Sequence, residues 1–194
     1  MNEPKPLAGK KVAILATDGF EQSELTSPRN ALINAGAKVD IVSQKAGTIT
    51  GWSGKNWAED VTVDKILDDV KAEYYDGLVL PGGLINPDTL RQDKQAINFI
   101  RGFFSANANK PVAAICHGPW LLAEAGVLKG RRVTSFGSIS TDLKNAGADW
   151  VDEPVVVDKG LVTSRTPDDL PAFNKKLLEE VREGRHHGSS LVNF

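Results

Sequence analysis

Short apolar runs alternate with longer amphipathic segments along most of the chain. The runs are continuous and consist mainly of valine, isoleucine, leucine and alanine, as expected of strands buried on both faces of a sheet. The sequence predicts such strands at 11–17, 38–43, 76–81 and 111–116, and a further, more polar strand at 131–136.

The amphipathic segments between these runs have apolar residues at helical spacing and glycines near their ends. Pro119 suits the first turn of one such helix and Gly126 suits its end. In the last segment, Thr166 suits an N-cap and Pro167 a first turn. The predicted helical segments are 18–36, 93–108, 118–128, 140–148 and 166–183.

The segment 47–63 is rich in Gly, Thr and Trp and predicts short strands or a hairpin outside this rhythm. The segment 153–165 predicts a hairpin with a turn near 158–160. Repeated strand–helix units indicate a mostly parallel sheet with helices on both faces. We predict a single domain spanning 1–194, with its core at about 10–183. The last residues, 184–194, show no periodic pattern and are predicted to form a flexible tail.

Composition excludes several classes of function. The chain has 194 residues and a formal net charge of −2, with acids and bases mixed along its length, so no nucleic-acid-binding surface is expected. No window approaches the ~20 apolar residues of a membrane span, and the N-terminus lacks the apolar core of a signal peptide, which predicts a cytoplasmic protein. The single cysteine and three histidines, including His186 and His187, argue against a structural zinc site. No cofactor motif occurs, because LPGG lacks the GxGxxG spacing.

The only cysteine, Cys116, stands at the end of the predicted strand 111–116. A lone cysteine in that setting is often a packing residue. However, ligands of parallel α/β sheets bind at the carboxyl ends of strands, and Gly118 and Pro119 suit a sharp turn into a helix, as in a nucleophile elbow. The positive end of that helix predicts a pKa below the ordinary thiol value of about 8.5.

Neighbouring groups suit a nucleophilic thiol. Gly82 and Gly83 end the preceding strand, so their backbone N–H groups, with that of His117, can form an oxyanion hole. His117 is either a turn residue or the base beside the sulfur. The acid is either Glu21, near the start of the first helix, or Asp88, as the orienter of His117. Glu21 can equally serve only to complement the helix dipole.

The segments AICHGPWLLAEAGVLKGRRVTSF, LVLPGG, DGFEQSEL and NAGADWVDEPVVVDKGLVTSRTPDDLPAF resemble the PfpI (ThiJ/PfpI) family of the class I glutamine-amidotransferase-like superfamily. The similarity covers about 10–183 and is greatest to the bacterial general stress proteins of that family. With the strand–helix pattern, it implies a flavodoxin-like three-layer α/β sandwich with a nucleophile elbow.

The resemblance also implies roles for individual residues. Cys116 matches the nucleophile, His117 its neighbouring histidine, Glu21 the glutamate bonded to the thiol, and Gly83 and His117 the oxyanion donors. Asp88 is the nearest match to an acid that the partner subunit supplies in PfpI-type proteases. Those proteases have Glu at this position, in a loop that is one residue shorter.

Three functions follow from the resemblance, and all of them need the same activated thiol. The first is a glyoxalase or deglycase of stress defence that acts on reactive carbonyls or on modified proteins and nucleotides. The second is an intracellular cysteine peptidase or amidase whose triad forms in an oligomer. The third is a non-enzymatic redox sensor or chaperone. A homodimer or higher homo-oligomer is expected in each case.

Overall fold

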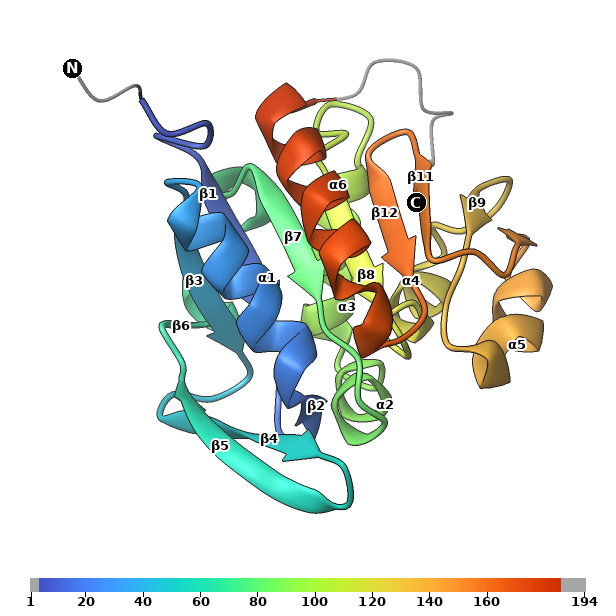
Figure 1. Ribbon diagram of the computed structural model, residues 1–194, viewed down its shortest axis with the longest axis horizontal. Coiled ribbons are helices and arrows are strands. Elements are labelled where there is room, and N and C mark those ends of the chain that lie inside the picture. Colours follow the sequence, from blue (N-terminus) through green and yellow to red (C-terminus); the bar gives the residue numbers. More distant parts are fainter. Residues whose placement is uncertain (1–3, 186–194) are drawn as a thin grey trace.

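The structure, a computed structural model, describes residues 4–185 and contains a central seven-stranded sheet (Figure 1). All neighbouring strands of this sheet run parallel except the edge hairpin that adds the first strand in the sheet order. The order is β11 (Val155–Asp158), β12 (Leu161–Ser164), β8 (Val112–Ile115), β7 (Gly77–Leu80), β1 (Lys11–Leu15), β3 (Lys38–Ser43) and β6 (Lys65–Ile66). The predicted mostly parallel α/β sheet is confirmed.

Helices cover both faces of the sheet. On one face, α1 (Gln22–Asn34) and α6 (Leu170–Glu183) lie side by side (Figure 1). The other face carries α3 (Lys94–Phe104), α4 (Trp120–Ala125) and the short α5 (Ser140–Asn145). The apolar run of β1 is continuous because the strand is covered on both faces. Val12 and Ile14 pack in the core on the α1 and α6 side, and Ala13 and Leu15 pack in the core on the α3 and α4 side.

Two small sheets lie outside the central one. The predicted hairpin at 47–63 forms β4 (Thr48–Ser53) and β5 (Asn56–Thr62), and β4 also pairs with β2 (Phe20–Glu21). The predicted strand at 131–136 is only β9 (Arg132–Val133), which pairs with β10 (Asp149–Trp150) and not with the central sheet. That expectation was wrong in extent, because the remainder of the run turns away to contact His117.

Short helical turns complete the described chain. The segment after Gly83, expected as a loop, forms α2 (Ile85–Leu90). Four 3₁₀ turns occur at Leu67–Asp69, Ala72–Tyr74, Gly137–Ile139 and Pro167–Asp169. Gly126 ends α4 in the left-handed conformation, as predicted.

No helix within 4–185 is long and apolar enough to cross a membrane. The predicted tail histidines, His186 and His187, lie outside the described residues.

Candidate active site

Cys116 occupies a strained turn between β8 and α4. Its φ is +62°, a left-handed conformation that is uncommon for a residue with a side chain and costs about 1–2 kcal/mol. Backbone hydrogen bonds hold it there: Cys116 donates to the Ser164 carbonyl at 3.1 Å and accepts from the Phe136 N–H at 2.9 Å. The neighbouring strand and loop therefore impose the predicted nucleophile elbow, which turns the thiol away from the sheet.

Glycine is required where the chain passes closest to the thiol. A Cβ atom on Gly82 would lie 2.7 Å from the Cys116 Cβ and 2.5 Å from Glu24 Oε2. A Cβ atom on Gly118 would lie 2.5 Å from the Leu80 carbonyl oxygen. The PGG and CHG sequences thus allow β7 and the elbow to approach each other more closely than any larger residue permits.

A buried carboxyl lies beside the sulfur, and it belongs to Glu24. Its side chain is fully buried, Oε2 accepts a hydrogen bond from the Gly82 N–H at 2.8 Å, and the carboxyl interacts with the Cys116 thiol. Burial raises the pKa of Glu24 to about 8, although the Gly82 N–H acts in the opposite direction. The carboxyl is therefore largely protonated at neutral pH.

The glutamate that interacts with the thiol is therefore Glu24, and the assignment of that role to Glu21 is wrong. Helix α1 begins only at Gln22, so Glu21 is the N-cap residue and is half-buried at the rim, where burial raises its pKa. Helical side chains lean toward the N-terminus, which brings Glu24, within the first turn, over the strand ends. A sequence signal existed, because Glu24 precedes the buried Pro28 and Leu32 by four and eight positions and so shares their face.

The thiol is itself buried, with 8% of its residue surface exposed. Burial raises the pKa of Cys116, and the charge of an ionised Glu24 raises it further. The predicted lowering of this pKa is therefore wrong, because the loss of hydration outweighs the favourable N–H groups at the helix start. Two adjacent negative charges are strongly disfavoured, so the two groups titrate as a coupled pair.

Two backbone N–H groups face the sulfur. Those of His117 and Gly83 form hydrogen bonds to it, and both act to lower the thiol pKa. Gly83 has φ +78° and stands at the turn after β7, where it presents its N–H toward the elbow. The structure thus brings together the two predicted oxyanion donors, while their catalytic use stays a prediction.

His117 lies within reach of the sulfur. Its Nδ1 is 3.3 Å from Cys116 Sγ, and its Nε2 is 3.3 Å from Ser138 Oγ. The ring stacks on Phe136 with centroids 4.7 Å apart and makes an edge contact with Trp120, with centroids 5.1 Å apart. Burial lowers the pKa of His117, so the imidazole is neutral at neutral pH and can accept the thiol proton.

Asp88 is not one of the groups bonded to His117 in the described part of this chain. It lies exposed on α2, where its backbone carbonyl accepts a hydrogen bond from Gln92. The outer ring nitrogen of His117 instead meets Ser138, which the sequence analysis did not single out. A role for Asp88 supplied by a partner subunit stays a prediction.

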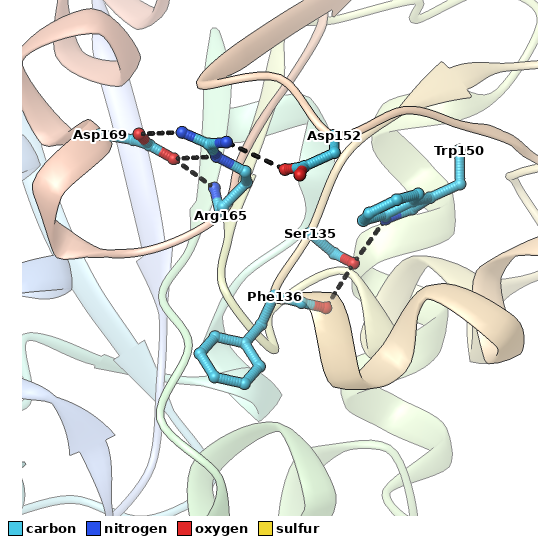
Figure 2. Close-up of polar contacts among 6 residues, drawn as sticks. All are labelled: Ser135, Phe136, Trp150, Asp152, Arg165 and Asp169. Carbon is cyan, nitrogen blue, oxygen red and sulfur yellow. Dashed lines mark hydrogen bonds and ion pairs between the residues drawn. The ribbon is translucent and has the colours of Figure 1, made fainter.

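Two polar clusters lie next in sequence to Phe136 and Ser164, whose backbone groups bond Cys116, and Figure 2 shows their side chains. The buried Ser135 hydroxyl accepts from Trp150 Nε1 at 3.0 Å and donates to the Phe136 carbonyl at 3.0 Å. Beside it, Arg165 makes hydrogen bonds to the Asp169 carboxylate at 2.9 and 3.1 Å and to Asp152 at 2.9 Å. These residues were not anticipated, because their partners are separated in the sequence or lie in irregular segments.

Comparisons with known proteins identify the family of this chain. A model of the DJ-1/PfpI family matches residues 10–180. The chain is 50% identical over 170 residues to "Protein/nucleic acid deglycase 2" of Escherichia coli K12, covering 87% of this chain and 96% of that protein. It is 46% identical over 171 residues to "General stress protein 18" of Bacillus subtilis 168, covering 88% and 96%.

A solved structure from Anabaena variabilis, with DJ-1/ThiJ/PfpI-like and ferritin-like domains, superimposes with a TM-score of 0.82 and 37% identity. The match covers 88% of this chain and 47% of the Anabaena chain, so it spans about half of that protein. With the elbow, the buried glutamate and the family match over most of its length, the chain belongs to the DJ-1/PfpI family.

Proposed function

We propose that this protein is a cysteine-dependent enzyme of stress defence that acts on reactive carbonyls, such as methylglyoxal, or on their early adducts with proteins and nucleotides. The observation that carries the proposal is the contact of Cys116 Sγ with His117 Nδ1 at 3.3 Å, on a left-handed elbow facing two backbone N–H groups. The names of the deglycase and stress-protein relatives support the choice of substrate class.

The proposed reaction begins with addition of the thiol to the aldehyde carbon. The S–H proton passes to His117 Nδ1, the C=O π pair moves to oxygen, and the new oxyanion is stabilised by the N–H groups of His117 and Gly83. The His117 proton then neutralises that oxyanion, which gives a hemithioacetal. No bond of the substrate other than the C=O π bond breaks in this step.

The second phase needs a group that moves a proton between adjacent carbons. One proton leaves the former aldehyde carbon and one is delivered to the neighbouring carbon, while the hydroxyl oxygen on the first carbon loses its proton and the neighbouring carbonyl oxygen gains one. These shifts convert the hemithioacetal to a thioester without any change in overall oxidation state. Glu24, whose pKa is about 8, can exchange a proton near neutral pH and lies beside the sulfur. Water then cleaves the thioester into lactate and the free thiol. With an amine adduct, the thiol instead replaces the amine at that carbon in the first step: the C–S bond forms, the C–N bond breaks, and the amine leaves with the proton of the thiol.

The test is to incubate the protein with methylglyoxal and measure D-lactate and L-lactate separately with stereospecific dehydrogenases. Cys116→Ser and His117→Gln are the active-site variants, and the exposed Glu59→Gln is the matched surface control. We expect lactate of predominantly one hand, no turnover in Cys116→Ser and wild-type turnover in Glu59→Gln. Equal lactate formation by Cys116→Ser would rule out a Cys116 mechanism.

A cysteine peptidase is the second candidate, because the Cys116–His117 contact also suits acyl transfer. In that case Asp88 of a second subunit would complete the triad, and a homodimer or larger assembly would be required. Light scattering measures the assembly, and casein hydrolysis abolished by Asp88→Asn would favour this candidate.

A redox sensor is the third candidate, favoured by a mass gain at Cys116 after mild peroxide without turnover in either assay. A cytoplasmic location is proposed for all three.

A further inference from the structure

His117 is held on three sides by residues of the same chain. Phe136 stacks on one face of the imidazole and the edge of Trp120 closes another side. Cys116 Sγ and Ser138 Oγ stand at 3.3 Å from the two ring nitrogens. Both nitrogens therefore have a partner, so the ring has one orientation in which both contacts are made.

We propose that Ser138 is the positioning residue of His117 and takes, within one chain, the place that an acid holds in a Cys–His–acid triad. The inference rests on the Cys116–His117 chemistry of the proposed function and identifies how that chemistry is oriented. A hydroxyl differs from a carboxylate because it both donates and accepts hydrogen bonds. Ser138 can thus accept from Nε2–H when the thiol donates to Nδ1, and can donate to Nε2 when Nδ1 carries the proton.

The segment that carries Ser138 is anchored at its start. The Phe136 N–H donates to the Cys116 carbonyl, and its own carbonyl accepts from Ser135, which in turn accepts from Trp150 (Figure 2). Ser138 follows directly, in the 3₁₀ turn Gly137–Ile139. The elbow and the hydroxyl that orients its histidine are therefore tied together by the backbone of one short segment.

The charges around the ring leave the imidazole without an ionic partner among the described residues that contact it. Cys116 faces Nδ1, with Glu24 behind the sulfur. On the α4 side, Arg91 lies over the Trp120 indole and pairs with Glu124. Asp142 of α5 accepts from Trp120 Nε1 at 2.8 Å.

A neutral partner has a predictable consequence. A carboxylate at the position of Ser138 would stabilise the imidazolium and, through it, a thiolate at Sγ. A hydroxyl stabilises neither charge strongly, so the resting pair is a neutral imidazole beside a thiol. The proton then moves only when a substrate accepts the sulfur electron pair.

The experiment compares Ser138→Ala, Ser138→Thr and Ser138→Asp with the wild type and with Asp88→Asn. Nitrogen-15 NMR reports the tautomer and the pKa of His117, whose signals are identified by their loss in His117→Gln. The second readout is the rate at which iodoacetamide alkylates Cys116, measured against pH. Neither readout needs a substrate, so they test Ser138 even if lactate formation fails and the proposed function is wrong.

In Ser138→Ala we expect a changed tautomer ratio of His117 and roughly five- to tenfold slower alkylation at neutral pH, the effect of losing one neutral hydrogen bond. Ser138→Thr should restore both readouts. Ser138→Asp should raise the pKa of His117 by about one unit or more and speed alkylation near pH 6.5. The side chain of Ser138 is exposed, so these variants leave the core unchanged.

Two results would overturn the proposal. One is a Ser138→Ala protein whose His117 tautomer and alkylation–pH profile match those of the wild type. The other is that Asp88→Asn reproduces the changes expected of Ser138→Ala, which would assign the orientation of His117 to a partner's acid. A loss of thermal stability in Ser138→Ala with both readouts unchanged belongs to the first result, since it reports a structural role only.

Discussion

The Glu24 carboxyl and the Cys116 thiol are buried side by side; Glu24 raises the pKa of the thiol, whereas the hydrogen bond from the thiol acts to lower the pKa of Glu24. Glu24 is fully buried, and its Oε2 already accepts the Gly82 N–H at 2.8 Å. The carboxyl also interacts with the Cys116 thiol. At neutral pH the pair is a carboxylic acid next to a thiol, and removing one proton makes removal of the second harder.

Replacing Glu24 by Gln should make the stability of the protein less dependent on pH. In the native state the pKa of Glu24 is about 8, against an ordinary value of 4.5. Between these values the native state holds a proton that the unfolded state releases, so the wild type loses stability as the pH rises. Relative to Glu24→Gln, we expect a loss on the order of 3 kcal/mol between pH 5 and pH 8.

Urea unfolding at several pH values measures this difference. The exposed Glu59→Gln serves as the control and should follow the wild type throughout. A constant difference between the wild type and Glu24→Gln from pH 5 to pH 8 would show that Glu24 does not retain its proton in the folded protein.

The same substitution should simplify the titration of the thiol. Thiolate absorbance at 240 nm, corrected with Cys116→Ala, should rise over two coupled steps in the wild type, because an ionised Glu24 raises the pKa of Cys116. Glu24→Gln removes that charge, so we expect a single step and more thiolate at pH 8–9 than in the wild type. Identical curves for the two proteins would contradict the coupling.

Gly82→Ala should disrupt the site and the fold together. Its Cβ would lie 2.5 Å from Glu24 Oε2 and 2.7 Å from the Cys116 Cβ, distances that force the elbow or α1 to move. We expect a destabilisation of roughly 2–4 kcal/mol, as for other overpacked buried sites. Gly137→Ala is the matched control, because its Cβ would have no neighbour within 4 Å. Thermal unfolding measures the stability of both variants. Equal melting temperatures would contradict the close packing of Gly82 against Glu24 and Cys116.

Asp169→Asn should lower the stability of the protein in a pH-dependent way, because it removes the carboxylate that bonds Arg165. Burial alone would raise the pKa of Asp169, but hydrogen bonds from the Arg165 guanidinium and backbone hold the pKa below its ordinary value of 3.8. The carboxylate thus contributes stability above that pH and loses it as the pH falls toward the native pKa.

We therefore expect Asp169→Asn to be less stable than the wild type at pH 7, by roughly 1–3 kcal/mol, with the gap narrowing near pH 3. The adjacent Asp168→Asn, whose side chain is exposed, should stay close to the wild type at both pH values. A gap that persists unchanged at pH 3 would mean that the charge of Asp169 is not the source of the stabilisation.

The sequence predicted the central sheet well because its strands are buried on both faces and read as uninterrupted apolar runs. It failed for the run at 131–136, where β9 contains only Arg132 and Val133. Only Val133 and Phe136 of that run are apolar, and periodicity over six residues cannot distinguish a strand from a turning segment. The segment around Asp88 was likewise expected as a loop, because one and a half helical turns are too short to show a period.

The order of residues along the chain determined by itself that a lone thiol ends an apolar run just before a helix start, and that a glycine pair ends the preceding apolar run. Those features are local, and local patterning is visible in a sequence. Only the tertiary structure decided that Glu24 and not Glu21 contacts the thiol, that Ser138 meets His117, and that burial raises the thiol pKa. The bond between Glu24 and Gly82 joins residues 58 positions apart, and the contact of Ser138 with His117 joins residues 21 apart. Such contacts, and the loss of hydration that comes with them, depend on how the layers pack.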